Sequence, residues 1–230
     1  MDFIKAKKEK GENNKQFTYR ILKENIMNLS LEPGAEISEV EISDALNVSR
    51  TPVREAIVKL KEEKLINVFP QRGSLVSKMN LKLIEEAAFL REICDKEILK
   101  IVCLEENREE LLKELKKNLE YQRISVEYKE NTYEFFRLDN LFHEIIYKHC
   151  DKINIWKAIK RLSTHYDRLR LFDTLEKMNF WEIIDQHEEI ISILENQEKE
   201  KVDYIVENHL FNFKKILNIF RRKFPNYFEE

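Results

Sequence analysis

The chain has 230 residues, of which 43% are hydrophobic and 36% charged, and only 3 are glycine. This composition excludes a disordered or fibrous protein and favours one or two globular, mainly helical domains. The formal net charge of −3 excludes nucleic-acid binding through an overall positive field. No apolar run approaches the ~18 residues that span a bilayer, so we expect no membrane association. Residues 1–15 have no hydrophobic signal core and are expected to form a flexible tail of a cytoplasmic protein.

A helix–turn–helix pattern follows that tail. The sequence Ser38-Glu39-Val40-Glu41 reads as a capping box, which predicts a helix to about Leu46 that Asn47 closes in a left-handed conformation. Thr51 is expected to cap a second helix whose first residue is Pro52, because proline lacks the N–H that the first turn leaves unpaired. One face of this second helix is apolar at helical spacing, with Val53, Ala56, Ile57 and Leu60.

Polar residues at the start of the second helix point to DNA reading. Arginines at a helix N-terminus suit both phosphate and guanine edges. The residues 65–69 and 74–77 then read as two strands around the turn 70–73, so they predict a hairpin, or wing, with Arg72 at its tip. The predicted DNA-binding residues are Ser49, Arg50, Thr51, Arg54, Arg72 and Gly73.

These motifs resemble the winged-helix domain of the GntR family of bacterial transcription regulators. The resemblance covers about Tyr19 to Lys78 and depends on the order SRTPVREA, a Leu-rich helix and then P-x-R-G. It implies a winged helix–turn–helix domain at 16–78 and a homodimer that reads an inverted repeat in double-stranded DNA. Two positions depart from the pattern. Lys64 replaces a frequent glycine, which predicts slight strain, and Val40 replaces a DNA-contacting arginine of the FadR member.

Residues 79–230 read as consecutive helices without further glycine. Short connections between helices favour an antiparallel arrangement. The predicted fold class is therefore mainly α, with the winged helix–turn–helix domain followed by an all-α, six-helix antiparallel bundle. Breaks between the six helices are expected near Glu106, Lys129, Asp151, Met178 and Gln197.

Ionisable residues interrupt the apolar stripes of three of these helices. Asp139 and His143 are four residues apart on one helix, and His187 and His209 lie on two later ones. One carboxylate and three imidazoles that converge in a core suit a borderline divalent metal. Each histidine could equally be a core residue bonded to a carbonyl, since buried polar groups need partners. The spacing leaves both interpretations open.

A second resemblance favours the metal. Residues from about Leu81 to Phe224 resemble the FCD ligand-binding domain of the FadR subfamily, with a helix number nearer its VanR branch, on the segments LDNLFHEII, DQHEEIISIL and VENHLFNF. The resemblance implies a helical effector-binding and dimerisation domain at 79–230 that binds one divalent ion per chain, zinc first, with nickel or manganese as alternatives. The implied ligands are Asp139, His143, His187 and His209.

Two further residues are candidates for the effector, a small carboxylate. Arg91 matches an arginine on the first FCD helix and could pair with the acid, although a surface salt bridge with Asp95 is the alternative. His165 lies in an apolar stripe and either faces the effector or simply packs there.

We therefore predict a non-enzymatic, effector-responsive transcription regulator, a repressor, with a hinge near Ser77–Asn80. A metal-dependent, hydrolase-like enzyme fused to a DNA-binding domain is the alternative, because three histidines and an aspartate also suit hydrolysis by a metal-activated water. A constitutive architectural binder, whose helical domain only dimerises, is a third possibility. It would need a core that binds nothing, against which the four predicted ligands argue.

Overall fold

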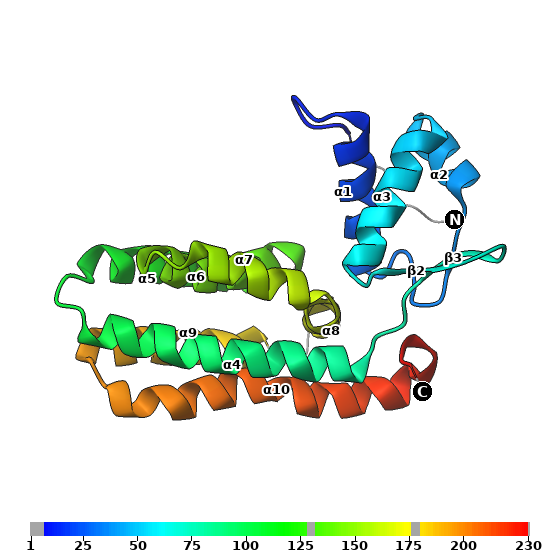
Figure 1. Cartoon of the computed structure of the whole chain (residues 1–230). Helices are drawn as coiled ribbons and strands as arrows, with labels where there is room; N and C mark the ends of the chain where they lie inside the picture. Colours follow the sequence, from blue (N-terminus) through cyan, green and yellow to red (C-terminus); the bar gives the residue numbers. More distant parts are fainter. Residues whose placement is uncertain (1–6, 128–131, 176–179, 230) are drawn as a thin grey trace. The chain divides into compact units, whose positions relative to one another are not determined.

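The computed structural model describes residues 7–127, 132–175 and 180–229 (Figure 1). The chain forms two compact units. The first holds the residues up to Ile84 together with Thr164–Arg168 and the residues from Ile219 onward, and the second holds Glu85–Ser163 and Leu169–Asn218. Each unit is described by itself.

The first unit contains the predicted winged helix. Three helices pack on a small antiparallel sheet of order β1-β3-β2, in which Phe69 pairs with Gly73 to close the wing turn. The left-handed conformations of Gln71 (φ 62°) and Gly73 (φ 92°) make this turn. The elements are α1 (Asn14–Met27), β1 (Glu36–Ile37), α2 (Glu39–Leu46), α3 (Arg50–Glu62), β2 (Ile66–Phe69) and β3 (Gly73–Val76).

Local sequence explains most of these boundaries. The Ser38 side chain accepts a hydrogen bond from the Glu41 N–H, which is one of the two bonds of the predicted capping box, and Asn47 ends α2 with φ 51°, as predicted. Lys64, where the family often has glycine, also lies in the left-handed region with φ 62°. The helix α3 differs from the prediction because it begins at Arg50, so that Ser49, and not Thr51, is its N-cap.

Proline explains the earlier start of α3. Pro52 lies in the first turn, where no N–H has an intrahelical partner, so it is tolerated there as well as at the first position. Helix α1 also begins earlier than the expected tail boundary. Asn13 and Gln16 form a capping box in which each side chain accepts a hydrogen bond from the other's backbone N–H.

The described residues between Leu81 and Lys223 are mainly helical, as predicted. The structure divides the expected helix between Asp151 and Met178 in two at Ser163, whose N–H and hydroxyl both donate to the Ile159 carbonyl. The described part of this region therefore holds seven α-helices instead of six. They are α4 (Leu81–Leu104), α5 (Glu109–Glu127), α6 (Thr132–His149), α7 (Ile153–Leu162), α8 (Thr164–Leu175), α9 (Phe180–Asn196) and α10 (Val202–Lys223), followed by the short turn η2 (Pro225–Tyr227).

The core of the second unit is built from several of these helices. Helix α5 packs against α6 and α9, and α4 and α10 contribute further buried side chains. Fully buried members include Val102, Leu115, Phe142, Leu194 and Ile205. Among the described residues, no helix is both long and apolar enough to cross a membrane.

Candidate metal centre and DNA-reading surface

The four predicted metal ligands come together in the second unit. Each of Asp139, His143, His187 and His209 offers one ligand atom, and these atoms all lie within 4.8 Å of one another. Helix α6 supplies the first two, α9 the third and α10 the fourth. The first three side chains are buried and His209 is half-buried. The i, i+4 spacing on α6 explains why Asp139 and His143 lie on the same side of that helix.

Two of the separations between ligand atoms fit a single ion. The Nε2 atoms of His143 and His209 are 3.1 Å apart, and His187 Nε2 lies 3.5 Å from Asp139 Oδ1. Ligands that bind zinc at its usual bond lengths lie about 2.8–3.6 Å from each other in octahedral or tetrahedral arrangements. The two pairs therefore already have the spacing that a shared ion requires.

Two glutamines fix the orientation of two imidazoles. Gln122 Oε1 lies 2.8 Å from His187 Nδ1, and Gln186 Oε1 lies 2.8 Å from His209 Nδ1. Because an amide oxygen only accepts hydrogen bonds, both Nδ1 atoms must donate, which leaves each Nε2 with a lone pair. His187 Nε2 is buried and has no hydrogen-bond partner among the described residues. A metal ion would satisfy it.

Burial also keeps the imidazoles neutral. It lowers the pKa of His187 to about 3, with Arg170 and Arg91 adding a smaller repulsion. It lowers the pKa of His143 and of His209 well below the ordinary value of 6.5. Neutral imidazole is the form that binds metal, so the three side chains need not lose a proton to bind at neutral pH.

Asp139 has a cation beside it that the sequence did not reveal. Arg170, from α8, forms an ion pair with Asp139 Oδ2, while Oδ1 faces His187. The sequence pattern predicted one continuous helix through Ser163, so the break at that residue was missed. A continuous helix gives no reason to place Arg170 at the site. Gln122 and Gln186 were missed as well, although Gln186 directly precedes a predicted ligand.

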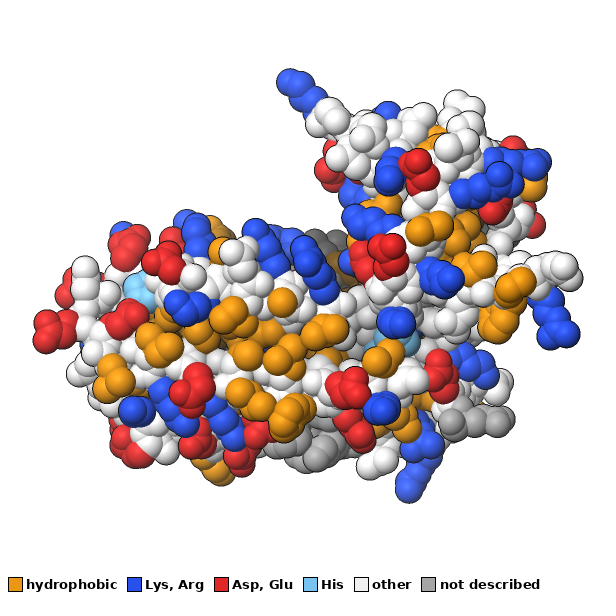
Figure 2. All heavy atoms as spheres, in the orientation of Figure 1, with side chains coloured by type: hydrophobic (Ala, Val, Ile, Leu, Met, Phe, Trp, Pro, Cys, Tyr) orange, Lys and Arg blue, Asp and Glu red, His pale blue; other side chains and the backbone are white. Residues whose placement is uncertain are grey.

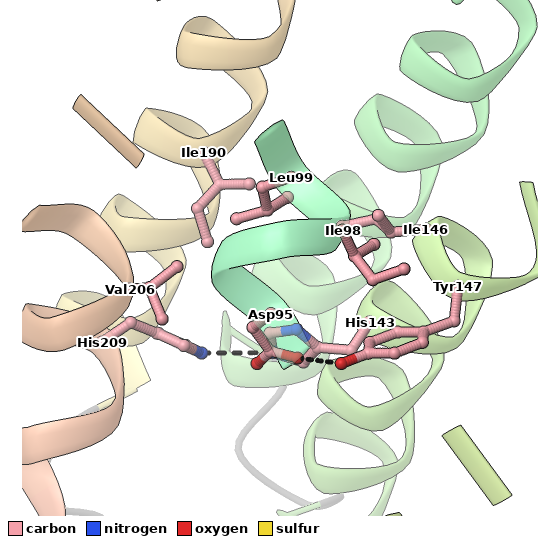
Figure 3. A pocket seen from close by; sticks show the side chains of 9 residues that line it. All are labelled: Asp95, Ile98, Leu99, His143, Ile146, Tyr147, Ile190, Val206 and His209. Atoms are coloured by element: carbon pink, nitrogen blue, oxygen red, sulfur yellow. Dashed lines mark hydrogen bonds between the residues drawn. The ribbon is translucent and has the colours of Figure 1, made fainter. Parts of the chain in front are cut away.

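A small cavity borders the group (Figure 3). His143 and His209 line one side, and its polar lining also includes Asp95, which accepts a hydrogen bond of 2.6 Å from the Tyr147 hydroxyl. The cavity has room for about one water molecule. The remaining wall is apolar and consists of Ile98, Leu99, Ile146, Ile190 and Val206.

The two predicted effector residues have different surroundings. Arg91 is buried and donates to Asp95 Oδ2 at 3.0 Å, so the alternative salt bridge exists, but inside the protein and next to the cavity. His165 lies in the first unit, apart from the metal ligands. Its Nδ1 accepts from the Asn80 N–H at 3.1 Å and its Nε2 donates to the Lys64 carbonyl at 2.8 Å. A contact of either residue with an effector stays a prediction.

The predicted DNA-binding residues lie on the surface of the first unit. Ser49, Arg50 and Thr51 are exposed at the first turn of α3, and the Arg54 guanidinium, also exposed, pairs with Glu39 of α2 at 2.7 Å. The wing turn exposes Arg72 and Gly73. The structure thus places these six predicted residues at the start of one helix and the tip of one hairpin.

Comparison with known proteins identifies the family. Residues 14–76 match the family described as bacterial regulatory proteins, gntR family, and residues 86–212 match the FCD domain. The chain belongs to the gntR family. It is a DNA-binding transcriptional regulator, and the GntR and FCD assignments that the sequence suggested are confirmed.

Relatives in this family are regulators of similar length. The chain is 33% identical over 223 residues to the HTH-type transcriptional repressor RspR of Escherichia coli (strain K12), which covers 94% of this chain and 93% of that protein. It is 31% identical over 185 residues to the gluconate operon transcriptional repressor of Bacillus subtilis (strain 168), covering 77% and 74%.

Solved structures show the same fold. A GntR transcriptional regulator from Rhodococcus sp. RHA1 superposes with a TM-score of 0.71 at 20% identity, covering 89% of this chain and 97% of that one. E. coli McbR/YncC also gives a TM-score of 0.71, at 19% identity, with 91% and 99% covered.

Proposed function

We propose that this regulator is a repressor whose affinity for its operator is controlled by a small carboxylate bound at a metal centre in the FCD domain. The observation that carries the proposal is the convergence of Asp139, His143, His187 and His209, with ligand atoms within 4.8 Å of one another. Two relatives named as repressors support the sign of regulation.

The four side chains would hold one divalent ion per chain, with zinc first and nickel or manganese as alternatives. When bound, the ion supplies open coordination positions that attract a carboxylate. Because the cavity beside His143 and His209 is small and mostly apolar, it favours a short acid. Asp95 holds Arg91 at the cavity edge, so an incoming acid would share the guanidinium with Asp95.

On the DNA side, the first turn of α3 would enter the major groove and Arg72 would contact the adjacent backbone. A homodimer would present two such helices to an inverted repeat, because protein symmetry imposes operator symmetry. Helix α4 offers an apolar surface for the second copy, with a band of hydrophobic side chains along it (Figure 2). The exposed hydrophobic residues of α4 include Phe89, Ile93 and Ile101.

The hydrolase alternative is less well supported. Hydrolysis needs a general base next to the metal-bound water. Among the residues that line the described cavity, Asp95 is the carboxylate, and it is held by both Tyr147 and Arg91. The relatives named above are regulators, which agrees with a binding role for the centre.

Metal content and operator affinity test the proposal together. We expect the purified protein to contain about one divalent ion per chain by elemental analysis. Operator affinity should then shift with one member of a panel of short carboxylic acids, and chelation should abolish that shift, although the metal-free protein should still bind the operator. An unchanged response of the chelated, metal-free protein would refute the role of the metal in sensing.

A further inference from the structure

The first turn of helix α8 is fastened to the DNA-binding unit by three buried side chains. Thr164 Oγ1 donates to the Glu63 carbonyl at 2.9 Å, and His165 Nε2 donates to the Lys64 carbonyl at 2.8 Å. Arg168 Nη1 donates to the Ser77 carbonyl at 2.7 Å. All these residues belong to the first unit, although α8 continues into the second.

The groups that α8 holds are the ends of the DNA-reading elements. Glu63 caps the C-terminus of α3, and Lys64 is the next residue, in its left-handed conformation. Ser77 follows β3, the return strand of the wing. Asn80, whose N–H donates to His165 Nδ1, caps the start of α4 through a bond from the Leu83 N–H to its side chain. One helical turn therefore holds the recognition helix, the wing and the predicted hinge.

Two residues further along the same helix, Arg170 contacts the metal group. Successive residues of an α-helix are about 100° apart, so Arg168 and Arg170 leave α8 on nearly opposite sides. Arg170 pairs with Asp139 Oδ2 and leaves Oδ1 toward His187 Nε2. The guanidinium thus orients the carboxylate so that one oxygen stays available to an ion.

We propose that Arg170 is a positioning residue for Asp139, and that α8 transmits the state of this site to the end of the recognition helix and the wing. The inference rests on the proposed metal centre. Without an ion, Arg170 neutralises a buried carboxylate. With a divalent ion on Oδ1, Arg170 faces added positive charge, which weakens its hold on Asp139 because Coulomb forces are strong where water is scarce.

A bound carboxylate would act in the opposite sense. It restores negative charge at the site and offers Arg170 a further partner besides Asp139 and Asn140. Thr164 and Arg170 are only about 9 Å apart along the helix axis, so a displacement at Arg170 reaches the anchoring side chains within a rigid segment. Arg168 is fully buried, and its Nε and Nη2 have no hydrogen-bond partner among the described residues. This anchor therefore contributes less stability than a fully hydrogen-bonded guanidinium would.

Hydrogen exchange of the full-length protein tests directly whether α8 transmits the state of the metal site to the winged helix, a transmission that we call the relay. Adding zinc alone should change amide protection at residues 61–66 and 75–80 of the wild type. The same change should be absent in Arg170→Met, which should still bind one zinc per chain. Arg161→Met removes an exposed arginine of α7 and should keep the wild-type response. A wild type that binds zinc without any change in these segments, or an Arg170→Met variant that keeps the change, overturns the relay.

Measuring the operator Kd with and without zinc distinguishes a failure of the relay from a failure of the proposed regulatory function. Zinc should alter the operator Kd of the wild type by about 5- to 150-fold, the usual range of allosteric coupling, and the ratio should fall toward one in Arg170→Met. The variant Thr164→Val/His165→Phe should bind zinc as the wild type does and also lose the ratio. A zinc-dependent exchange pattern without any change in operator or acid binding would sustain the relay and refute the proposed regulation.

Discussion

At the scale of single residues, the exposed start of α3 gives the most direct test of DNA reading. Removing Arg54 should cost about 1–3 kcal/mol of operator binding if the guanidinium pairs with a guanine edge. Its ion pair with Glu39 lowers this only slightly, since exposed pairs contribute little. Fluorescence anisotropy with a labelled operator measures the loss. Arg72→Ala should have a smaller effect. Equal affinities of the wild type and of Arg50→Ala/Arg54→Ala would sink the assignment.

The metal ligands should respond individually to substitution. His187→Ala should abolish stoichiometric metal binding and lower the Tm, because the ion stabilises only the assembled helices. His187 also stacks on Phe142 with ring centroids 4.1 Å apart, so part of the lost stability comes from packing. Elemental analysis separates the two effects. The matched control is His149→Ala, which removes a histidine paired with Glu105 outside the group. Full metal content in His187→Ala would contradict the ligand set.

A glycine substitution at Lys64 should change the free energy of unfolding in the opposite direction to the same substitution at the nearby Lys61. Its left-handed φ of 62° is unfavourable for any residue with a Cβ, so Lys64→Gly should raise the free energy of unfolding by about 0.5–1 kcal/mol. Lys61→Gly, inside α3 and also exposed, should lower it by about 1 kcal/mol. Urea denaturation measures both. A loss of stability in Lys64→Gly would show that the turn carries no strain.

At the scale of elements, the anchor of α8 predicts a pH dependence. Burial lowers the pKa of His165 from 6.5 to about 4, so the unfolded chain binds more protons than the folded one between these values. The stability from neutral His165 is complete above pH 6.5 and is lost as the pH falls toward 4, by at most about 3 kcal/mol. His165→Gln keeps a donor and an acceptor but does not titrate. Its unfolding free energy should fall less steeply over this window, and an unchanged slope would show that His165 is not responsible.

Sequence patterns predicted the elements well where the signals are local. The cap at Ser38, the left-handed Asn47 and the glycine turn of the wing all depend on residues within a few positions of each other. The two-residue strand β1 is too short for a periodic pattern, and the break at Ser163 lies inside an uninterrupted helical pattern. That break was missed because a serine hydroxyl that bonds to the preceding turn does not require a helix to end.

The residues of the metal site also divide into those that local sequence patterns predict and those that only tertiary packing brings to the site. Asp139, His143, His187 and His209 were found because each stands out within the apolar stripe of its own helix. Arg170, Gln122 and Gln186 contact these ligands from positions whose neighbours in sequence carry no comparable signal. Which polar side chains surround a ligand depends on tertiary packing, and a single sequence does not give that packing.

At the scale of the whole molecule, the exposed apolar side chains of α4 predict a dimer. Ile93→Glu places a charge in the hydrophobic band and should convert a dimer into monomers, with weaker operator binding because two linked helices bind more tightly than one. Tyr204→Glu changes a residue of α10 that is 69% exposed and should leave the dimer intact. Sedimentation equilibrium measures whether each variant is a monomer or a dimer. A monomeric wild type, or a dimeric Ile93→Glu, contradicts this interface.

The parallel bridge between Met79 and Phe228 has a consequence for the order of synthesis. Met79 exchanges backbone hydrogen bonds with Tyr227 and Glu229, and Asn80 bonds to the side chain of Glu229, which lies 149 residues later. The contact between Met79 and residues 227–229, here called the brace, can therefore form only after the ribosome has synthesised the entire helical region. Until α8 has been made, a nascent winged helix lacks both this brace and the anchor of α8, so we expect chains stalled at that stage to hold a loosely ordered winged helix. Limited proteolysis of ribosome-bound chains stalled before residue 160 checks this, and full protection of residues 61–80 in them would refute it.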